Sequence, residues 1–163
     1  MKINVMTSNI RFANAQDDEH HWPRRKEIWA GIIQKYDIDI LGTQEGREPQ
    51  LREALSLLPN YTLVDHHRAW IKERMYPCLF IKNDAFKIHR SGDIWLSDHP
   101  YVAGSISFGS AFPRLSTYTE LECKTSHRRV FVINCHLDHM KSETRAQQIK
   151  VLLNELKTNN QEG

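Results

Sequence analysis

Asn9, Glu45 and His136 are the residues of this 163-residue sequence whose types and positions best suit chemistry on a charged ligand. Each lies at or just beyond the end of a short apolar stretch, and residues 130–135, before His136, form the most apolar one. Polar side chains that follow strands often lie in loops over a rigid scaffold, where α/β proteins bind ligands. We therefore expect these three residues to line one site.

The chemistry that these residue types suit is metal-assisted binding of a phosphate. Mg²⁺ is typically held by one or two carboxylates and keeps several waters, so Glu45 alone could anchor it and the Asn9 amide could orient that glutamate or accept from a metal-bound water. His136 could bind a phosphoryl oxygen or pair with an acid, and both contacts favour its charged form. Structural roles remain open: a turn for Asn9, a solvated acid for Glu45 and a buried histidine for His136.

A zinc hydrolase is a second possibility for the segment after residue 135. His136, Asp138 and His139 offer imidazole and carboxylate ligands at close spacing, which suits zinc. The His-x-His-x-Asp-His pattern of metallo-β-lactamases is incomplete here, because Asn134 occupies its first position. The zinc interpretation therefore lacks one ligand.

Hydrophobic periodicity predicts an alternation of strands and helices that would position these residues. Gly42 is expected to end the second strand, and Ser91-Gly92 is expected to form a turn. The first helix should bury a stripe of Ile28, Trp29, Ile32, Ile33 and Tyr36, and the last helix one of Ala146, Ile149, Leu152, Leu153 and Leu156. The expected strands are 2–10, 38–41, 61–64, 78–81, 86–88, 118–123 and 130–135, and the expected helices are 23–36, 50–58 and 142–158.

This order of elements predicts an α/β layered domain with a mixed sheet, in which the later strands form an antiparallel meander. A strand, a crossover helix and a parallel strand place the carboxyl ends of both strands at one edge, so Asn9 and Glu45 should lie at the same rim. A chain of 163 residues, 40% apolar and 26% charged, suits one domain with a sizeable core.

Composition narrows the partners and the location of the protein. With 22 Lys plus Arg against 20 Asp plus Glu, the net charge of +2 gives no overall cationic field, which neither implies nor excludes nucleic acid. No apolar run approaches the roughly 18 residues of a transmembrane segment, and no signal peptide is evident. Three cysteines at spacings that match no zinc motif indicate a reducing compartment, so we expect a cytoplasmic protein.

Four pieces of the sequence together resemble the endonuclease/exonuclease/phosphatase family, whose fold is DNase-I-like. They are residues 7–11, residues 39–45 with the pair Gln-Glu, residues 95–100 with Trp-Leu-Ser-x-x-Pro, and residues 132–139 with Asn-x-His-Leu-Asp-His. The resemblance implies a four-layer α/β sandwich with two central mixed sheets. It also implies Mg²⁺- or Mn²⁺-dependent cleavage of phosphate esters in nucleic acids, phospholipid head groups, or sugar and nucleotide phosphates.

Carried over by position, the resemblance assigns roles to the candidate residues. Glu45 would be the metal ligand, Asn9 its neighbour in the metal and phosphate site, and His136 the catalytic histidine that contacts the scissile phosphate. Asn134, Asp138 and Arg145 would contribute to substrate binding.

Two departures from the family pattern limit the expected activity. The acid that partners the family's histidine has no clean counterpart in residues 65–79, where Glu73 is out of register. The Gly-Asp-x-Asn segment and the Asp-His pair that activate water normally follow a helix like 142–158, but the sequence ends at Gly163. We therefore expect residues 1–163 to form one incomplete domain without its carboxy-terminal part, weak or inactive alone.

An incomplete domain should also expose apolar surface. The absent part is expected to supply the second sheet, so this chain should expose an apolar sheet face or edge and self-associate through it. The alternative to an enzyme is a noncatalytic, truncated or degenerate family member that binds metal or a phosphorylated ligand.

Overall fold

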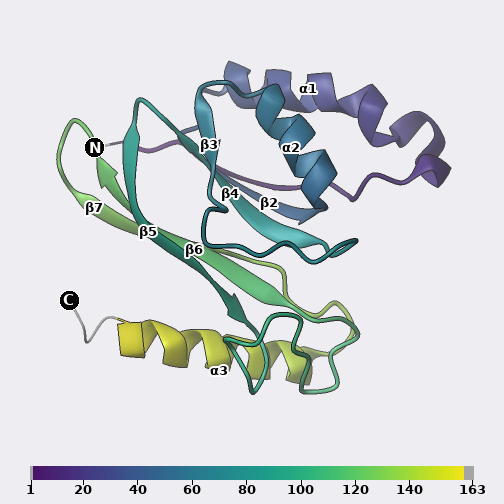
Figure 1. Ribbon diagram of the computed structural model, residues 1–163. Helices are drawn as coiled ribbons and strands as arrows, with labels where there is room; N and C mark the ends of the chain where they lie inside the picture. The colour runs from purple at the N-terminus through teal and green to yellow at the C-terminus, as the bar shows by residue number, and fades with distance from the viewer. Residues whose placement is uncertain (1, 160–163) are drawn as a thin grey trace.

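The structure is a computed structural model that describes residues 2–159 (Figure 1). Strands and helices alternate in the first half, and strands dominate from residue 61 onward, as the sequence predicts. The elements are β1 (Val5–Asn9), the 3₁₀ helix η1 (Ala15–His20), α1 (Trp22–Lys35), β2 (Ile40–Gly46), α2 (Glu48–Ser56), β3 (Tyr61–Leu63), β4 (Tyr76–Lys82), β5 (Phe86–Trp95), β6 (Leu115–Cys123), β7 (Arg129–Cys135) and α3 (Ser142–Asn159).

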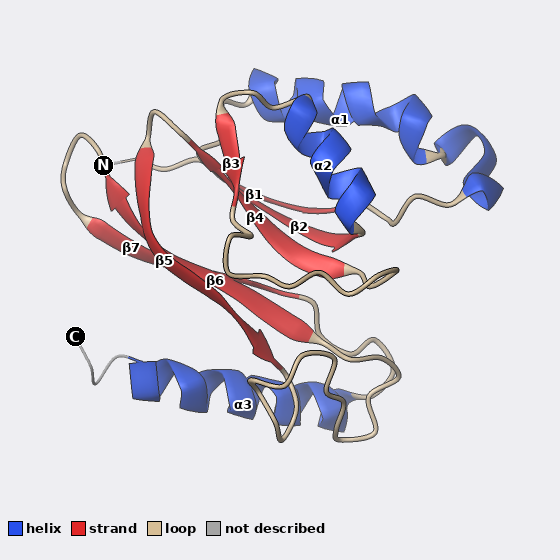
Figure 2. Cartoon of the chain, viewed as in Figure 1, coloured by secondary structure: helices blue, strands red, loops and turns tan. Residues whose placement is uncertain are grey.

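The elements form four layers, with two sheets between two helical layers. The first sheet has the order β1-β2-β4-β3, in which β1 and β2 are parallel and the other pairs antiparallel. The second is the antiparallel meander β5-β6-β7. Helices α1 and α2 cover the outer face of the first sheet, and α3 covers the second (Figure 2). This arrangement confirms the α/β layered class and the mixed sheet.

The expectation that an absent part of the domain supplies the second sheet is wrong. Both sheets lie within residues 2–159, and apolar side chains fill the space between them, among them Leu79 and Ile81 of β4 and Leu121 of β6, each at most 1% exposed. Burial of this apolar surface stabilises the pair of sheets against separation. Within the two sheets, the exposed large apolar side chains lie on the outer strands, where Val5 of β1 is 66% and Phe131 of β7 is 38% exposed.

The first helix buries a different side from the one that its periodicity predicts. Trp29 and Ile33 are buried as expected, but Ile28 and Tyr36 are 67% and 60% exposed. The cause is Trp22 in the first turn, which packs edge-on against Trp29 at 5.6 Å between ring centroids and whose indole N–H donates to Glu53 of α2. These contacts rotate the apolar face of α1 toward α2 and the first sheet.

The last helix also departs from its expected stripe, because polar residues occupy part of its buried side. Leu152 is buried against the second sheet, whereas Leu153 is 50% exposed. Thr144 and Gln148 are buried instead, and they hydrogen-bond the carbonyl of Phe108 and the hydroxyl of Ser110. The helix therefore fastens the loop before β6 as well as covering the sheet.

Two strands run through glycines that were expected to end them. Gly42 lies inside β2, where a Cβ would lie 3.1 Å from the Asn134 side chain, and Gly92 lies inside β5, where a Cβ would lie 2.6 Å from the Tyr118 hydroxyl. Each glycine therefore makes room for a large side chain from the neighbouring layer or strand, which is a use of glycine that differs from turn formation.

No helix of the described part of the chain is long and apolar enough to cross a membrane.

A buried ion pair connects the 64–75 loop to the second sheet. Arg68, whose side chain is 1% exposed, donates two hydrogen bonds of 2.7 Å to the two carboxylate oxygens of Asp93. Its Nη2 also donates to the Thr117 hydroxyl at 2.6 Å. The last residues of this loop, 72–75, lie beside the candidate site. The ion pair therefore helps to position one wall of that site.

Replacing Asp93 by asparagine is expected to lower the free energy of unfolding by about 3 kcal/mol near neutral pH, because the Arg68 charge stays buried without its counter-ion. Burial raises the pKa of Asp93, but the Arg68 and His67 side chains outweigh this and hold it at about 2. The stabilisation is therefore full above the unfolded-state pKa of about 4 and is lost as the pH falls through about 2. Urea unfolding as a function of pH measures both effects.

Asp84→Asn is the control for this prediction, because Asp84 is 77% exposed and lies 4.0 Å from Lys82. It should change the free energy of unfolding by less than about 0.5 kcal/mol. Equal stability of the Asp93 and Asp84 variants would contradict the prediction.

Candidate functional site

Asn9 and Glu45 lie side by side at one rim of the first sheet. The parallel pairing of β1 with β2 sets Asn9 opposite Gln44, and the Asn9 side-chain amide donates to Glu45 Oε1 at 2.8 Å. The Asn9 side-chain oxygen Oδ1 accepts from the backbone N–H of Arg11 at 2.9 Å. Asn9 therefore orients the glutamate, and the expected common rim is confirmed.

The backbone at Glu45 is unusual for a residue with a side chain. The pairing of β2 with β4 shifts register between Thr43 and Gly46, and within this bulge Glu45 has a φ of 67°. The left-handed region costs a non-glycine residue about 1–2 kcal/mol, and such strain and bulges concentrate near functional sites, where they aim a side chain. The chain thus bears a conformational cost at the residue that we identified as a candidate metal ligand.

Asn134 of β7 fixes this rim from the opposite sheet. Its amide donates to the carbonyls of Thr43 at 2.7 Å and Cys78 at 2.8 Å, and its oxygen accepts from Gln44 at 2.7 Å. Asn134 is 8% exposed and does not line the cavity described below. The structure therefore uses this side chain to join the two sheets, and substrate contact stays only a prediction from the sequence.

His136 follows β7 and reaches the same place from the second sheet. Its Nε2 lies 3.9 Å from Glu45 Oε1, so the ends of β1, β2 and β7 converge although they belong to two sheets. One phosphoryl group could contact both residues. The structure thus brings together the three residues on which the sequence analysis depends.

Arg114 is the residue of this site that the sequence analysis missed. It lies immediately before β6, is 8% exposed, and places Nη1 3.2 Å from His136 Nδ1 and Nη2 3.1 Å from His139 Nδ1. A guanidinium can only donate, so each Nδ1 accepts and the proton of each neutral imidazole is assigned to Nε2. The one feature of the sequence that could have indicated Arg114 is its position immediately before a strand.

The surroundings of His136 favour its neutral form in the absence of a ligand. Burial lowers the pKa of His136, and the positive charge of Arg114 lowers it further, while Glu45 opposes the shift. The ligand-free site therefore favours a neutral imidazole that presents an N–H. A bound anion would have to supply the interaction that favours the charged form.

Asp138 and Arg145 hold a loop together and do not line the cavity. Asp138 is 1% exposed, and its carboxylate accepts from the backbone N–H groups of Ala111, Met140 and Lys141. Burial raises the pKa of Asp138, but these bonds outweigh burial and lower it. Arg145 donates to the Asp138 carbonyl at 3.3 Å.

This geometry does not support the zinc interpretation, because backbone donors occupy the Asp138 carboxylate and only the two imidazoles remain of the three expected ligands. Within residues 2–159 no group of three or more His, Cys, Asp and Glu side chains is arranged to hold a metal ion. The donor that remains for a metal at the site is the hard carboxylate of Glu45, supported by Asn9. Such a donor suits Mg²⁺ or Mn²⁺ better than zinc.

A cavity of about 340 Å³ opens at this convergence. It contains one carboxylate, two imidazoles and two guanidinium groups beside two aromatic rings. Its lining residues are Arg11, Phe12, Glu45, Met75, Phe112, Arg114, His136 and His139.

Glu73, which the sequence analysis weighed as a partner of the histidine, instead bonds Arg47 at 2.8 Å.

Comparisons with solved structures agree with this architecture, whereas searches of the sequence against family models and curated proteins give no match. An endonuclease/exonuclease/phosphatase family protein from Bacteroides thetaiotaomicron aligns with a TM-score of 0.88 and 28% identity over 97% of this chain and 59% of its own. A mannosyl-6-phosphatase from the same organism gives 0.87 and 28% over 96% and 60%. The human Nocturnin catalytic domain gives 0.73 and 26% over 98% and 59%.

The chain therefore has the DNase-I-like α/β fold of the endonuclease/exonuclease/phosphatase family, as the sequence resemblance implies. It spans about 60% of the length of these solved chains.

Two substitutions at Glu45 test whether its backbone conformation is strained. Glu45→Gly and Glu45→Ala both remove the carboxylate, but only glycine accepts a φ of 67° without steric cost. The glycine variant should therefore be more stable than the alanine variant by about 1 kcal/mol in urea unfolding. Greater stability of the alanine variant would show that this backbone conformation is not strained.

Replacing Asn134 by leucine should lower the free energy of unfolding by about 2–4 kcal/mol, because two buried carbonyls and the Gln44 amide lose their partner. Chemical denaturation measures the loss. Asn154→Leu, at an exposed position of α3, is the matched control and should stay within about 0.5 kcal/mol of the natural chain. A similar small effect of both substitutions would show that Asn134 does not hold the sheets together.

Proposed function

We propose that this chain carries the metal-binding and phosphate-binding residues of a divalent-metal-dependent phosphoester hydrolase. The observation that supports this most directly is the 3.9 Å approach of His136 Nε2 to Glu45 Oε1, made by two sheets at one cavity. Solved structures with this fold include a mannosyl-6-phosphatase at 28% identity. The proposed substrate is therefore a phosphate ester, with nucleic acid, phospholipid head groups and sugar or nucleotide phosphates as its classes.

Glu45 is the residue that would hold the metal, with Asn9 keeping its carboxylate in place. Mg²⁺ needs few protein ligands when waters and substrate oxygens complete its shell, so one glutamate at a cavity is a sufficient anchor. A bound Mg²⁺ or Mn²⁺ would polarise the phosphate and favour a nucleophilic water. The hydrogen bond from Asn9 leaves the second carboxylate oxygen, Oε2, for this contact.

His136 would bind the phosphate through its Nε2 proton. Arg114 occupies Nδ1 of both His136 and His139, so it fixes each ring and directs each Nε2 proton away from itself. A preorganised donor and a buried guanidinium stabilise negative charge that develops on the phosphoryl oxygens during attack by water. Arg114 is therefore a positioning residue that also adds positive charge.

The described residues that line the cavity provide no carboxylate that could serve as a general base besides Glu45. Glu45 is the one carboxylate among the described residues that line the cavity, and it is assigned to the metal. General-base catalysis typically contributes about 10²–10⁴-fold, so the 163-residue chain alone should turn over slowly. A noncatalytic module that binds metal or a phosphorylated ligand is the alternative that this gap favours.

Hydrolysis of bis-p-nitrophenyl phosphate and p-nitrophenyl phosphate tests the proposal. Slow release of p-nitrophenol is expected with Mg²⁺ or Mn²⁺ and none with chelator. Glu45→Ala and His136→Ala should each lower the rate by about 10²-fold or to background, because each removes a contact that the transition state needs. Glu27→Ala, at an exposed position of α1 outside the cavity, should keep the natural rate.

Turnover of the natural chain no faster than that of Glu45→Ala would overturn the hydrolase proposal. Binding of Mn²⁺ that Glu45→Ala abolishes, measured by calorimetry on the same samples, would then support the noncatalytic alternative.

A further inference from the structure

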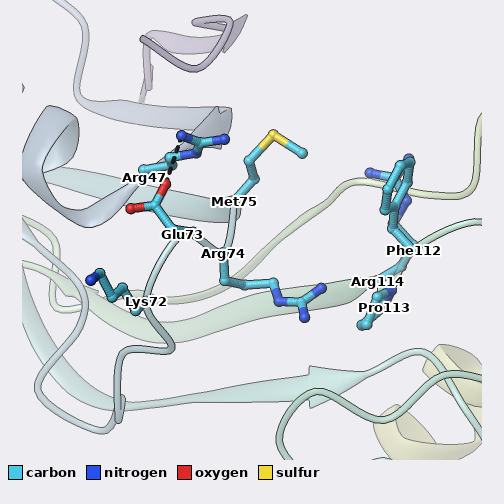
Figure 3. Close-up of a pocket in the computed structure, with 8 residues that line it drawn as sticks. All are labelled: Arg47, Lys72, Glu73, Arg74, Met75, Phe112, Pro113 and Arg114. Carbon is cyan, nitrogen blue, oxygen red and sulfur yellow. Dashed lines mark hydrogen bonds and ion pairs between the residues drawn. The ribbon is translucent and has the colours of Figure 1, made fainter. Parts of the chain in front are cut away.

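A second cavity, of about 310 Å³, adjoins the candidate site (Figure 3). One wall is the segment before β4, residues 72–75, together with Arg47, and the other is formed by residues 112–114 before β6. Met75, Phe112 and Arg114 line both cavities. A single ligand can therefore extend from one cavity into the other.

The second cavity is strongly cationic. Arg47, Lys72, Arg74 and Arg114 line it, and Glu73 is its one acidic lining residue. The Glu73 carboxylate is already paired with Arg47 at 2.8 Å, as the dashed line in Figure 3 shows. The remaining positive charge on Lys72, Arg74 and Arg114 favours an anionic occupant.

Three of the arginines that line this cavity have a buried donor without a partner. The Nε atoms of Arg47, Arg74 and Arg114 are buried and have no hydrogen-bond partner within residues 2–159. A buried donor without a partner costs about 1–3 kcal/mol, and such groups are rare in folded proteins. Three of them on arginines that line one cavity add to its positive potential, which an anion in the cavity would offset.

Arg74 lines the second cavity and does not line the first. Figure 3 shows its side chain extending from the 72–75 segment toward Pro113 and Arg114, across the space between the two walls. Guanidinium groups bind phosphate well, because several donors in a planar fork match its oxygens. Its volume of about 310 Å³ suits one such group and a short linker to the neighbouring cavity.

We propose that this cavity binds a second phosphate, so that the substrate is a small molecule that carries two phosphate groups. The inference rests on the proposed function, because the other phosphate is the one held beside Glu45 and His136. Arg74 supplies affinity for the second phosphate and takes no part in the reaction at the first.

Calorimetric titration with glucose 6-phosphate and glucose 1,6-bisphosphate in Mg²⁺ buffer tests this assignment. The bisphosphate should bind at least about tenfold more tightly, as two charge-assisted hydrogen bonds imply. Arg74→Gln should remove most of this difference and leave the monophosphate affinity within about twofold, while Arg74→Lys, which keeps the charge, should retain part of it. Arg128→Gln, at an exposed position outside both cavities, should behave like the natural chain.

Equal affinity for the two probes, or equal weakening of both by Arg74→Gln, would overturn the proposal. An effect of Arg128→Gln as large as that of Arg74→Gln would do the same, because it would indicate general charge attraction. A gain with 6-phosphogluconate equal to that with the bisphosphate would overturn the choice of phosphate over carboxylate.

Failure of the proposed function has a different signature in the same experiment. His136→Gln should weaken both probes if the first phosphate lies where we propose. If His136→Gln changes neither affinity but Arg74→Gln still removes the advantage of the bisphosphate, the anion cavity stands and the hydrolase site does not.

Discussion

The hydrogen bonds of Asn134 are the interaction on which the candidate site depends. One amide from β7 joins the carbonyls of Thr43 and Cys78 and the side chain of Gln44, so it ties the second sheet to two strands of the first. Gly42 makes this contact possible, since a side chain there would meet the asparagine at 3.1 Å. The approach of Glu45 to His136 follows from this fixed spacing, because each residue lies within two positions of a bonded one.

Electrostatics in the site are organised around one buried arginine. Arg114 bonds both imidazoles, and its charge and the burial of the ring lower the pKa of His136. Glu45 supplies the opposing charge at 3.9 Å. The ligand-free site therefore sets a neutral His136 donor beside the Arg114 cation and the Glu45 carboxylate, an arrangement that suits an anion bound together with a metal ion.

Sequence patterns predicted the class of fold and the residues that converge, because strand periodicity and parallel pairing constrain where Asn9 and Glu45 lie. They did not predict the glycines inside β2 and β5, since the large side chains that those glycines accommodate come from other strands. The buried side of α1 depended on a tertiary contact of Trp22 with α2. Arg114 escaped notice because its partners His136 and His139 are distant in sequence.

The position of the candidate site across two sheets has a mechanical consequence for the sandwich. Glu45 belongs to one layer and His136 follows a strand of the other, so sliding of the layers past each other changes the gap between them. An occupant that touches both residues resists such shear and favours the native arrangement by mass action. Occupancy and cohesion of the whole sandwich are therefore linked, although the contact lies at one end of it.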